Sequence, residues 1–388
     1  MMELLRVSGL LVLLAALSSP CASEDTCDAL GETNSCTFVR SVFERDLLQR
    51  TPSYQSILQE EKRHSSDVDT KRFAGETLGY VTPWNNHGYD TAKLFRSKFT
   101  YISPVWYQIR HSDHGKPILT GGHDVDVGWI AAVRGKVAGP HIVPRFMFEM
   151  NSLSPQESTR IVQLIRQEVK SQGFDGITLE IPVLQVTFDL IRSLGQALKE
   201  DGHLFILVLP TSQRNGQLTT PTELIAKVLP FVHRFSMNAY DYSSMGPNAP
   251  LPWLKATLEA LKPLKSNEKF LIGLAFYGYD TRDPIVASKY RELLETHRPA
   301  IEWDGSAHVQ QPLGQSFDVV ITPCGVGMLF PLPKPARRVL PLPPIDSRPS
   351  RAVHVGADWR SGLGHRTRTR LFLRPPLITK PEIAIQFG

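Results

Sequence analysis

One carboxylate in the segment GFDGITLEIP, residues 173–182, stands where it could bind a ligand or transfer a proton. The apolar and β-branched residues around Glu180 predict a buried strand, and alternation along that strand places Thr178, Glu180 and Pro182 on the same face. A carboxylate on such a face can accept hydrogen bonds or act as an acid or a base. Pro182, which ends this face, has no ionisable group.

Aromatic and acidic side chains recur at the carboxyl ends of the other predicted strands. They are Trp84, Trp106, Glu149, Tyr240, Asp241 and Tyr277. Aromatic faces stack on the C–H faces of sugar rings, and carboxylates accept hydrogen bonds from sugar hydroxyls. Core packing is the alternative interpretation for each aromatic residue taken singly. Their recurrence at so many strand ends favours a carbohydrate site.

The elements that would position these residues alternate between strands and helices. The clearest helix begins at Ser154, has Pro155 at its first position and Glu157 in a capping box, and ends before Gly173. Repeats of roughly 30 residues are typical of parallel βαβ units. The clustered glycines of doubly wound sheets are missing after the first strand, so the sequence predicts an α/β fold of the (β/α)₈ TIM-barrel type. The predicted strands span 77–84, 99–106, 141–149, 174–180, 203–210, 234–242 and 269–278.

The amino-terminal residues predict a secretory signal over 1–23. Arg6 precedes an apolar run that ends at Leu17, and Cys21 and Ser23 suit the small-residue positions of a signal peptidase site. A membrane anchor is the alternative, but the run is shorter than the roughly 20 apolar residues that a spanning helix needs. The expected location is therefore secreted or lysosomal, through the secretory pathway, with no membrane span.

Removal of this signal leaves Cys27, Cys36 and Cys324. An odd number of cysteines permits one disulfide and one free thiol, and Cys27 with Cys36 is the predicted pair. No His or Cys residues stand at metal-ligand spacing, so the sequence predicts no metal site.

The basic charge of the chain belongs to its carboxyl-terminal tail, 311–388. This tail has 11 Lys and Arg against 4 Asp and Glu, and it holds 12 of the 30 prolines. Because the whole chain is +5 and the tail is +7, the first 310 residues sum to −2. This charge argues against nucleic acid as a partner. The tail lacks helical or strand periodicity, so we expect it to be largely extended.

The ordered set of strand motifs resembles the chitinase-type glycoside hydrolase family 18. FDGITLEIP is similar to the fourth-strand signature of that family, MNAYDY to its sixth-strand motif and GLAFYG to its seventh-strand run. With LGYVTPWNNHGYD, FTYISPVW, HIVPRF and GPNAPL, the likeness is closest to the chitinase domain-containing, chitinase-like lectin branch. The resemblance spans roughly residues 74–305 and implies a chitinase-like barrel, with Trp303 as a further sugar-binding residue and no cofactor.

The departures from this family concern its catalytic residues. Carrying the signature over puts Thr178 where the family has an Asp, Glu180 where it has the Asp that orients the substrate, and Pro182 where it has the general acid. The third-strand serine-glycine motif is also replaced, and Arg145 in its place is a predicted interior partner for a carboxylate that the sequence does not identify.

The expected function is therefore that of a secreted carbohydrate-binding protein without catalytic activity. The resemblance implies oligosaccharides that contain N-acetylglucosamine, or microbial glycans, as ligands, and it suggests a cell-surface receptor partner and a role in innate sensing. Two alternatives stay open. One is a hydrolase that uses Glu149, Glu180 or Asp241 as its acid, and the other is a truncated isoform without a function of its own.

The domain organisation follows from these segments. After the signal we expect an N-terminal extension over 24–73, a chitinase-like barrel over 74–310 and the tail. The tail offers no counterpart of the eighth strand with its sugar-site Trp, although 317–323 or 325–330 could substitute as a strand. The predicted barrel is incomplete at that position.

Overall fold

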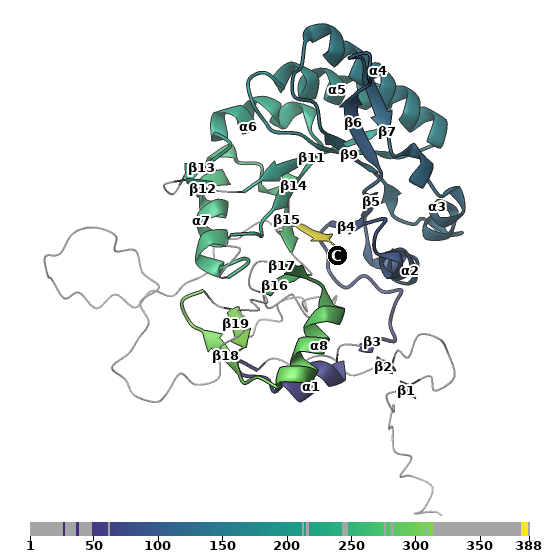
Figure 1. Ribbon diagram of the computed structural model, residues 1–388. Helices are drawn as coiled ribbons and strands as arrows, with labels where there is room; N and C mark the ends of the chain where they lie inside the picture. Colours follow the sequence, from purple (N-terminus) through teal and green to yellow (C-terminus); the bar gives the residue numbers. More distant parts are fainter. Residues whose placement is uncertain are drawn as a thin grey trace, which may run out of the picture. The chain divides into compact units, whose positions relative to one another are not determined.

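The computed structural model of this chain divides into two compact parts (Figure 1). It describes residues 26–27, 36–38, 49–60, 63–211, 213–214, 217–242, 247–274, 277–280, 283–307, 309–312 and 382–386. The barrel part contains the described residues of 69–243, 248–276 and 329–388, and the small part contains those of 1–68, 244–247 and 277–328. The predicted signal, 1–23, and the candidate strands 317–323 and 325–330 lie outside the described residues.

The strands of the barrel part confirm all the strands that the sequence predicted. Neighbours along the chain pair in parallel, as expected for βαβ units. The third barrel strand is interrupted at residues 143–144, so that its first half pairs with the strand before it and its second half with the strand after it. The strands are β4 (Thr77–Val81), β5 (Tyr101–Pro104), β8 (His141–Ile142), β9 (Arg145–Phe148), β10 (Gly176–Glu180), β11 (Leu204–Pro210), β14 (Arg234–Asn238) and β15 (Phe270–Leu274).

Helices follow the strands, and α4 has the predicted ends. Ser154 caps it through a complete capping box with Glu157, and Gly173 ends it in the left-handed conformation at φ 64°. A second helix, α6, begins after Pro221 without a side-chain cap. The helices are α2 (Asn86–Leu94), α3 (Val127–Arg134), α4 (Pro155–Gln172), α5 (Phe188–Glu200), α6 (Thr222–Val228) and α7 (Leu251–Leu261). The 3₁₀ turns are η1 (Arg96–Lys98), η2 (Gly122–Asp124), η3 (Leu229–Phe231), η4 (Lys262–Leu264) and η5 (Asn267–Lys269), and a short pair of strands, β12 (Gln213–Arg214) and β13 (Gln217–Leu218), precedes α6.

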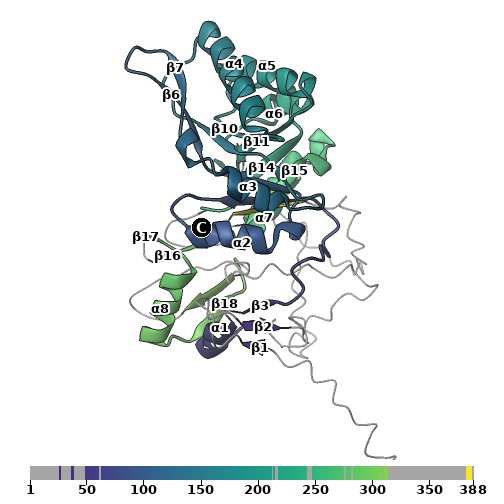
Figure 2. The same cartoon turned by 90° about the vertical axis from the view of Figure 1, so that its right-hand side faces the viewer.

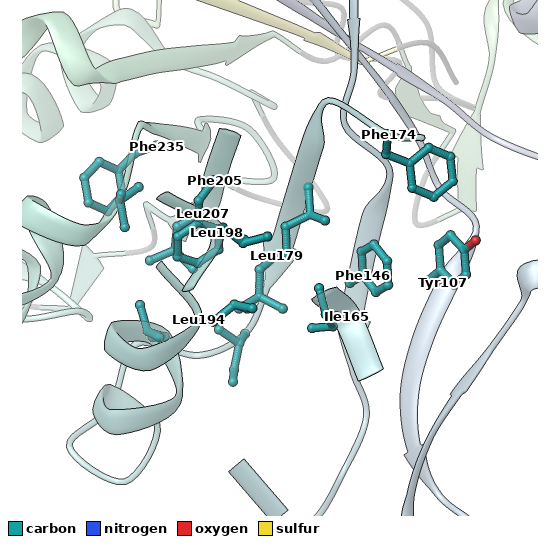
Figure 3. Close-up of a cluster of buried hydrophobic side chains, with 14 of the residues drawn as sticks. Tyr107, Phe146, Ile165, Phe174, Leu179, Leu194, Leu198, Phe205, Leu207 and Phe235 are labelled. Atoms are coloured by element: carbon teal, nitrogen blue, oxygen red, sulfur yellow. The ribbon is translucent and has the colours of Figure 1, made fainter. Parts of the chain in front are cut away.

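The main core lies between the outer face of the strands and the helices. Ile177, Leu179 and Ile181 belong to it, together with Ile161 and Ile165 of α4. Figure 3 shows side chains of α4 and α5 among those of the strands. The predicted alternation along β10 is thereby confirmed, and Glu180 and Thr178 are on the opposite, interior face. A separate interior cluster consists of Leu78, Tyr80, Tyr101, Val143, Ile206 and Leu271.

The eighth strand position is occupied, contrary to the expectation from the sequence. β20 (Glu382–Gln386) pairs in parallel with β15 on one side and with β4 on the other. The prediction that the tail offers no strand between the first and seventh strands is therefore wrong for these five residues. The physical reason is that two neighbouring strands present unpaired backbone groups, which a short segment with β-branched residues can satisfy.

A hairpin extends the sheet next to β9. β6 (Tyr107–His111) pairs in parallel with β9 and antiparallel with β7 (Pro117–Thr120). Gly115 in the intervening turn has φ 69°, a conformation that favours glycine. Figure 2 shows β6 and β7 at one side of the barrel part, with their turn standing away from the helices. The sequence analysis did not predict this hairpin.

The small part combines the N-terminal extension with a later segment of the chain. Tyr54, Ile57 and Leu58 of α1 pack with Tyr290 and Leu294 of α8. The described residues from 277 to 312 belong to this part, whereas the sequence analysis included 277–310 in the barrel. Its elements are β1 (Thr26–Cys27), β2 (Cys36–Phe38), α1 (Tyr54–Glu60), β3 (Arg63–Ser65), β16 (Gly278–Asp280), β17 (Asp283–Ile285), α8 (Ala287–His297), β18 (Ile301–Asp304) and β19 (Val309–Pro312).

The backbone register of β1 and β2 bears on the predicted disulfide. Cys27 stands directly opposite Cys36 in this antiparallel pair. Directly opposite residues of antiparallel strands have Cα atoms about 4.5–5.5 Å apart, within the range that a disulfide spans. The disulfide itself stays a prediction.

Candidate functional site

An ion pair on the interior face joins the first residue of β9 to the last residue of β10. The guanidinium of Arg145 binds the carboxylate of Glu180, and the two side chains are 16% and 31% exposed. The strands are neighbours in register, with Thr178 opposite Arg145 and Glu180 opposite Met147. Arg145 is thus the interior cation that the sequence predicted, and Glu180 is the carboxylate partner that the sequence left open. Arg145 Nε is buried without a hydrogen-bond partner.

Two tyrosines lie close enough to this pair for its charges to influence their pKa values. The hydroxyl of Tyr80 donates to Ser236 Oγ at 2.7 Å, and that of Tyr240 donates to Asn238 Oδ1 at 3.1 Å. Burial raises the pKa of both tyrosines well above the ordinary value of 10, and the charge of Glu180 adds to the rise. Both hydroxyls therefore stay protonated and keep their ability to donate hydrogen bonds at neutral pH.

The positions of the catalytic carboxylates in the resembling family have other roles here. The hydroxyl of Thr178 is buried and donates to Val143 O at 3.2 Å. Pro182 lies past the end of β10 and is exposed, and its carbonyl accepts a hydrogen bond from Thr187 Oγ1 at 2.6 Å. Thr187 Oγ1 also accepts from the backbone N–H of Leu184 at 3.0 Å. At this position the chain offers a backbone acceptor and no ionisable group.

A buried asparagine that the sequence analysis missed shapes the loop after β14. The backbone N–H of Asp241 donates to Asn248 Oδ1 at 2.7 Å, and that of Tyr242 donates to Asn248 O at 2.8 Å. Asp241 has φ 60°, a left-handed conformation that Asp tolerates better than most residues, and its side chain is exposed. The GPNAP segment around Asn248, with its turn-forming residues, was the available signal.

The predicted aromatic residues differ sharply in exposure. Trp84 is 74% exposed, whereas Trp106 is fully buried. The Trp106 ring lies 5.9 Å from that of Trp129 and 6.2 Å from that of Phe174, and its Nε1–H donates to Tyr89 Oη at 2.8 Å. Packing and a hydrogen bond thus account for the whole surface of Trp106, and its binding role stays a prediction that the burial does not favour. The binding role of Trp84 stays a prediction.

The remaining predicted site residues make other contacts. Glu149 follows β9 and binds Arg110 of the hairpin, with Nε and Nη2 both 2.5 Å from Oε2. Tyr277 and Trp303 belong to the small part. The ring centroids of Tyr277 and Tyr279 are 5.8 Å apart, and Trp303 lies in β18. The barrel part thus brings together Glu180, Arg145, Tyr80 and Tyr240, and the roles of Tyr277 and Trp303 stay predictions.

The part of the chain that the structure describes bears on metal and membrane binding. Within it, no three His, Cys, Asp or Glu side chains converge in a way that could hold a metal ion. Nor does any helix within these ranges combine the length and the apolar character needed to cross a bilayer.

Solved structures share the arrangement of parallel strands and helices. A chitinase from Chromobacterium violaceum superposes with a TM-score of 0.54 and 16% identity, over 64% of this chain and 85% of that chain. The fold is that of the family 18 chitinases. A family 18 chitinase from Cycas revoluta in complex with (GlcNAc)3 gives a TM-score of 0.54 at 12% identity, over 65% of this chain and 89% of that chain.

A class V chitinase from Pseudomonas fluorescens gives a TM-score of 0.52 at 18% identity, over 65% of this chain and 86% of that chain. No family model matches the sequence. The likeness to these enzymes therefore establishes the chitinase-like fold, and the lectin branch stays a prediction from the sequence motifs.

Proposed function

We propose that this protein binds oligosaccharides at the carboxyl ends of the barrel strands and does not hydrolyse them. The observation that carries the proposal is the ion pair of Glu180 and Arg145 on the interior face. Barrel proteins bind their substrates at this end of the strands. A carboxylate accepts hydrogen bonds and a guanidinium donates them, so the pair can bind sugar hydroxyls in both senses.

The surroundings of the ion pair support a sugar ligand. Tyr80 and Tyr240 keep their protons, which they donate to Ser236 and Asn238, so both side chains stay neutral beside the ion pair. The unpaired Nε–H of Arg145 is a buried donor, which is costly unless a ligand or water accepts from it. Trp84, in the loop after β4, exposes an aromatic face of the kind that stacks on sugar rings.

The absence of hydrolysis follows from the residue at the acid position. General acid catalysis contributes about 10² to 10⁴ in rate, and Pro182 cannot supply a proton. In a substrate-assisted mechanism of the kind some glycosidases use, this acid is the proton donor to the leaving group. Glu180 already binds Arg145, so its carboxylate is not free to replace the acid.

A hydrolase that uses Asp241 is the second candidate. The observation that favours it is the exposed carboxylate of Asp241, which Asn248 holds in a left-handed turn at the end of β14. Strained backbone of this kind occurs at functional sites. Release of reducing ends from chitin oligosaccharides, abolished by Asp241→Asn, would establish this candidate in place of the first.

Calorimetric titration of the purified full chain with chitin oligosaccharides tests the binding proposal. Glu180→Gln removes a charged acceptor, and charge-assisted hydrogen bonds contribute about 1.5–3 kcal/mol, so we expect at least a tenfold loss of affinity. The matched control is Asp201→Asn, which breaks an ion pair with Arg166 on the helices, and it should leave affinity unchanged. Wild-type protein that binds no chitin oligosaccharide, or two variants that bind alike, would refute the proposal.

The catalytic half of the proposal has its own test. Pro182→Glu restores a carboxylate at the acid position, but residues of a catalytic unit are strongly non-additive, and two further signature positions also differ. We expect no robust release of reducing ends from chitin hexasaccharide by this variant. Efficient cleavage would show that Pro182 alone separates this chain from an active enzyme.

The proposed ligands are oligosaccharides that contain N-acetylglucosamine, or microbial glycans, and the proposed location is outside the cell or in lysosomes. The signal-like segment 1–23 supports entry into the secretory pathway. A cell-surface receptor partner and a role in innate sensing rest on the branch resemblance alone. Amino-terminal sequencing of protein from culture medium tests the location, with a start near residue 24 expected and an intact Met1 against it.

The pairing of β20 with β4 and β15 favours this folded form over a truncated, non-functional one.

A further inference from the structure

The β6–β7 hairpin carries a polar face that continues from the Arg145–Glu180 ion pair. We propose that this hairpin face, made of Gln108, Arg110, Ile118, Thr120 and Glu149, binds the distal units of a longer oligosaccharide. The inference rests on the proposed function, because the ion pair would bind the proximal units. It predicts that the hairpin makes the protein bind long oligosaccharides more tightly than short ones.

The first argument is the continuity of one strand face. Alternation along β9 puts Arg145, Met147 and Glu149 on the same side. Arg145 Nη2 contacts Met147 Sδ at 3.6 Å, and the backbone N–H of Glu149 continues the ladder to Ile109 O at 2.9 Å. Four residues of strand span about 13 Å, so the row connects the interior ion pair to the hairpin over a distance longer than one sugar unit.

The second argument is that the two faces of the hairpin are used differently. Tyr107 and His111 bind α4, through Tyr107 Oη to Glu168 Oε1 at 2.7 Å and His111 Nε2 to Glu157 Oε1 at 2.7 Å. Ile109, between them, is fully buried in the main core. Residues 108 and 110 must therefore be on the other face, which α4 does not cover.

The third argument is the chemistry of that uncovered face. The side chains of Arg110 and Glu149 are 51% and 30% exposed even though they bind each other. The bonds between them use Nε, Nη2 and Oε2, so Nη1 and Oε1 can still donate to and accept from a ligand. Thr120 Oγ1 donates to Gln108 Oε1 at 3.0 Å, which fixes the amide orientation.

One apolar residue completes the match to a sugar. Ile118 stands opposite Arg110 in the hairpin register and is 36% exposed. A saccharide presents hydroxyls at its rim and C–H groups on its faces, so it needs polar groups beside an apolar surface. A protein partner would favour a larger apolar patch than a single isoleucine, and the hairpin face is therefore assigned to the glycan.

The test compares a short and a long ligand on the same variants of the full chain. We would titrate wild type, Arg110→Ala and His114→Ala with chitin disaccharide and hexasaccharide. His114 lies in the exposed hairpin turn outside the hairpin face, and its variant is the matched control. We expect Arg110→Ala to lose at least fivefold in hexasaccharide affinity and to keep its disaccharide affinity, while His114→Ala matches wild type for both. Thr120→Val, which removes only the bond to Gln108, should show the same selective loss on a smaller scale. This second variant keeps the inference testable if Arg110→Ala fails to fold.

The outcomes separate the two proposals. Wild-type protein that binds neither sugar refutes the proposed function, and this inference falls with it. Wild-type protein that binds both sugars, with no selective loss for the hexasaccharide in Arg110→Ala or Thr120→Val, overturns the hairpin inference alone. A bound protein that competes with the hexasaccharide only when Arg110 is intact would reassign the face to a protein partner and would also overturn it.

Discussion

Replacing Arg145 with methionine should destabilise the barrel part through the charge that it leaves behind. Arg145→Met keeps an unbranched apolar side chain but leaves Glu180 in the interior without its cation. Breaking a fully buried ion pair costs about 3–5 kcal/mol, whereas exposed pairs contribute about 0–1 kcal/mol. With side chains 16% and 31% exposed, this pair falls between those limits. Loss of the unpaired Nε–H removes a destabilising group and offsets part of the cost, so we expect about 2 kcal/mol.

Urea unfolding of the full chain would measure this free energy. A loss of about 2 kcal/mol corresponds to a fall in Tm of roughly 4–8 °C for a domain of about 150–250 residues. The double variant of Arg145→Met with Glu180→Gln removes both charges, so it should be more stable than Arg145→Met alone, with a coupling energy of about 1–2 kcal/mol. An Arg145→Met protein within about 0.5 kcal/mol of wild type, or additive effects in the double variant, would refute the argument that the interior ion pair contributes to stability.

Three further predictions concern other parts of the fold. Trp106→Ala should destabilise the protein by about 3–5 kcal/mol, because it empties a fully buried site, whereas Trp84→Ala should leave the urea midpoint unchanged and weaken glycan binding several-fold; equal effects on both properties would contradict the exposure difference. Hydrogen bonds from His111 and Ser154 lower the pKa of Glu157 from its ordinary 4.5 to about 2, so its contribution to stability is complete above pH 4.5 and is lost as the pH falls toward 2. Glu157→Gln should flatten the pH dependence of the urea midpoint in that window, and an unchanged slope would count against this linkage. A chain that ends before β20 leaves β4 and β15 as edges, so it should unfold at lower urea and form concentration-dependent aggregates; a monomer as stable as the full chain would show that β20 is dispensable.

The sequence could predict those features of the fold that depend on local patterns. The cap residues of α4 satisfy backbone groups within one turn, so Ser154, Glu157 and Gly173 determine its ends wherever the helix packs. Along β10, period-two alternation assigned Ile177 and Leu179 to the helices and Glu180 to the interior, because a strand buried on one side by helices admits one register. These predictions needed no knowledge of the partner elements.

The site was harder to predict because exposure depends on residues distant in the sequence. Trp84 and Trp106 both follow a strand and a proline at similar positions, yet one is 74% exposed and the other is fully buried. The difference comes from Trp129 of α3 and from Phe174 before β10, which close over Trp106. No pattern around either tryptophan contains that information.

β20 is a second feature that local sequence did not reveal, because here the structure contains a strand that the sequence analysis did not expect. Proline and arginine are frequent in the tail as a whole, and that average composition hides the run Glu382, Ile383, Ala384, Ile385 and Gln386. These residues form a strand because of their neighbours. Without them, β4 and β15 would each have a row of backbone donors and acceptors that water or another strand must satisfy. A strand between two others makes hydrogen bonds on both sides, and the run 382–386 contains no proline that would remove a backbone donor. The requirement for an eighth strand was therefore visible in the predicted topology, but composition could not identify the segment, because 317–322 has more β-branched residues than 382–386 and is also free of proline.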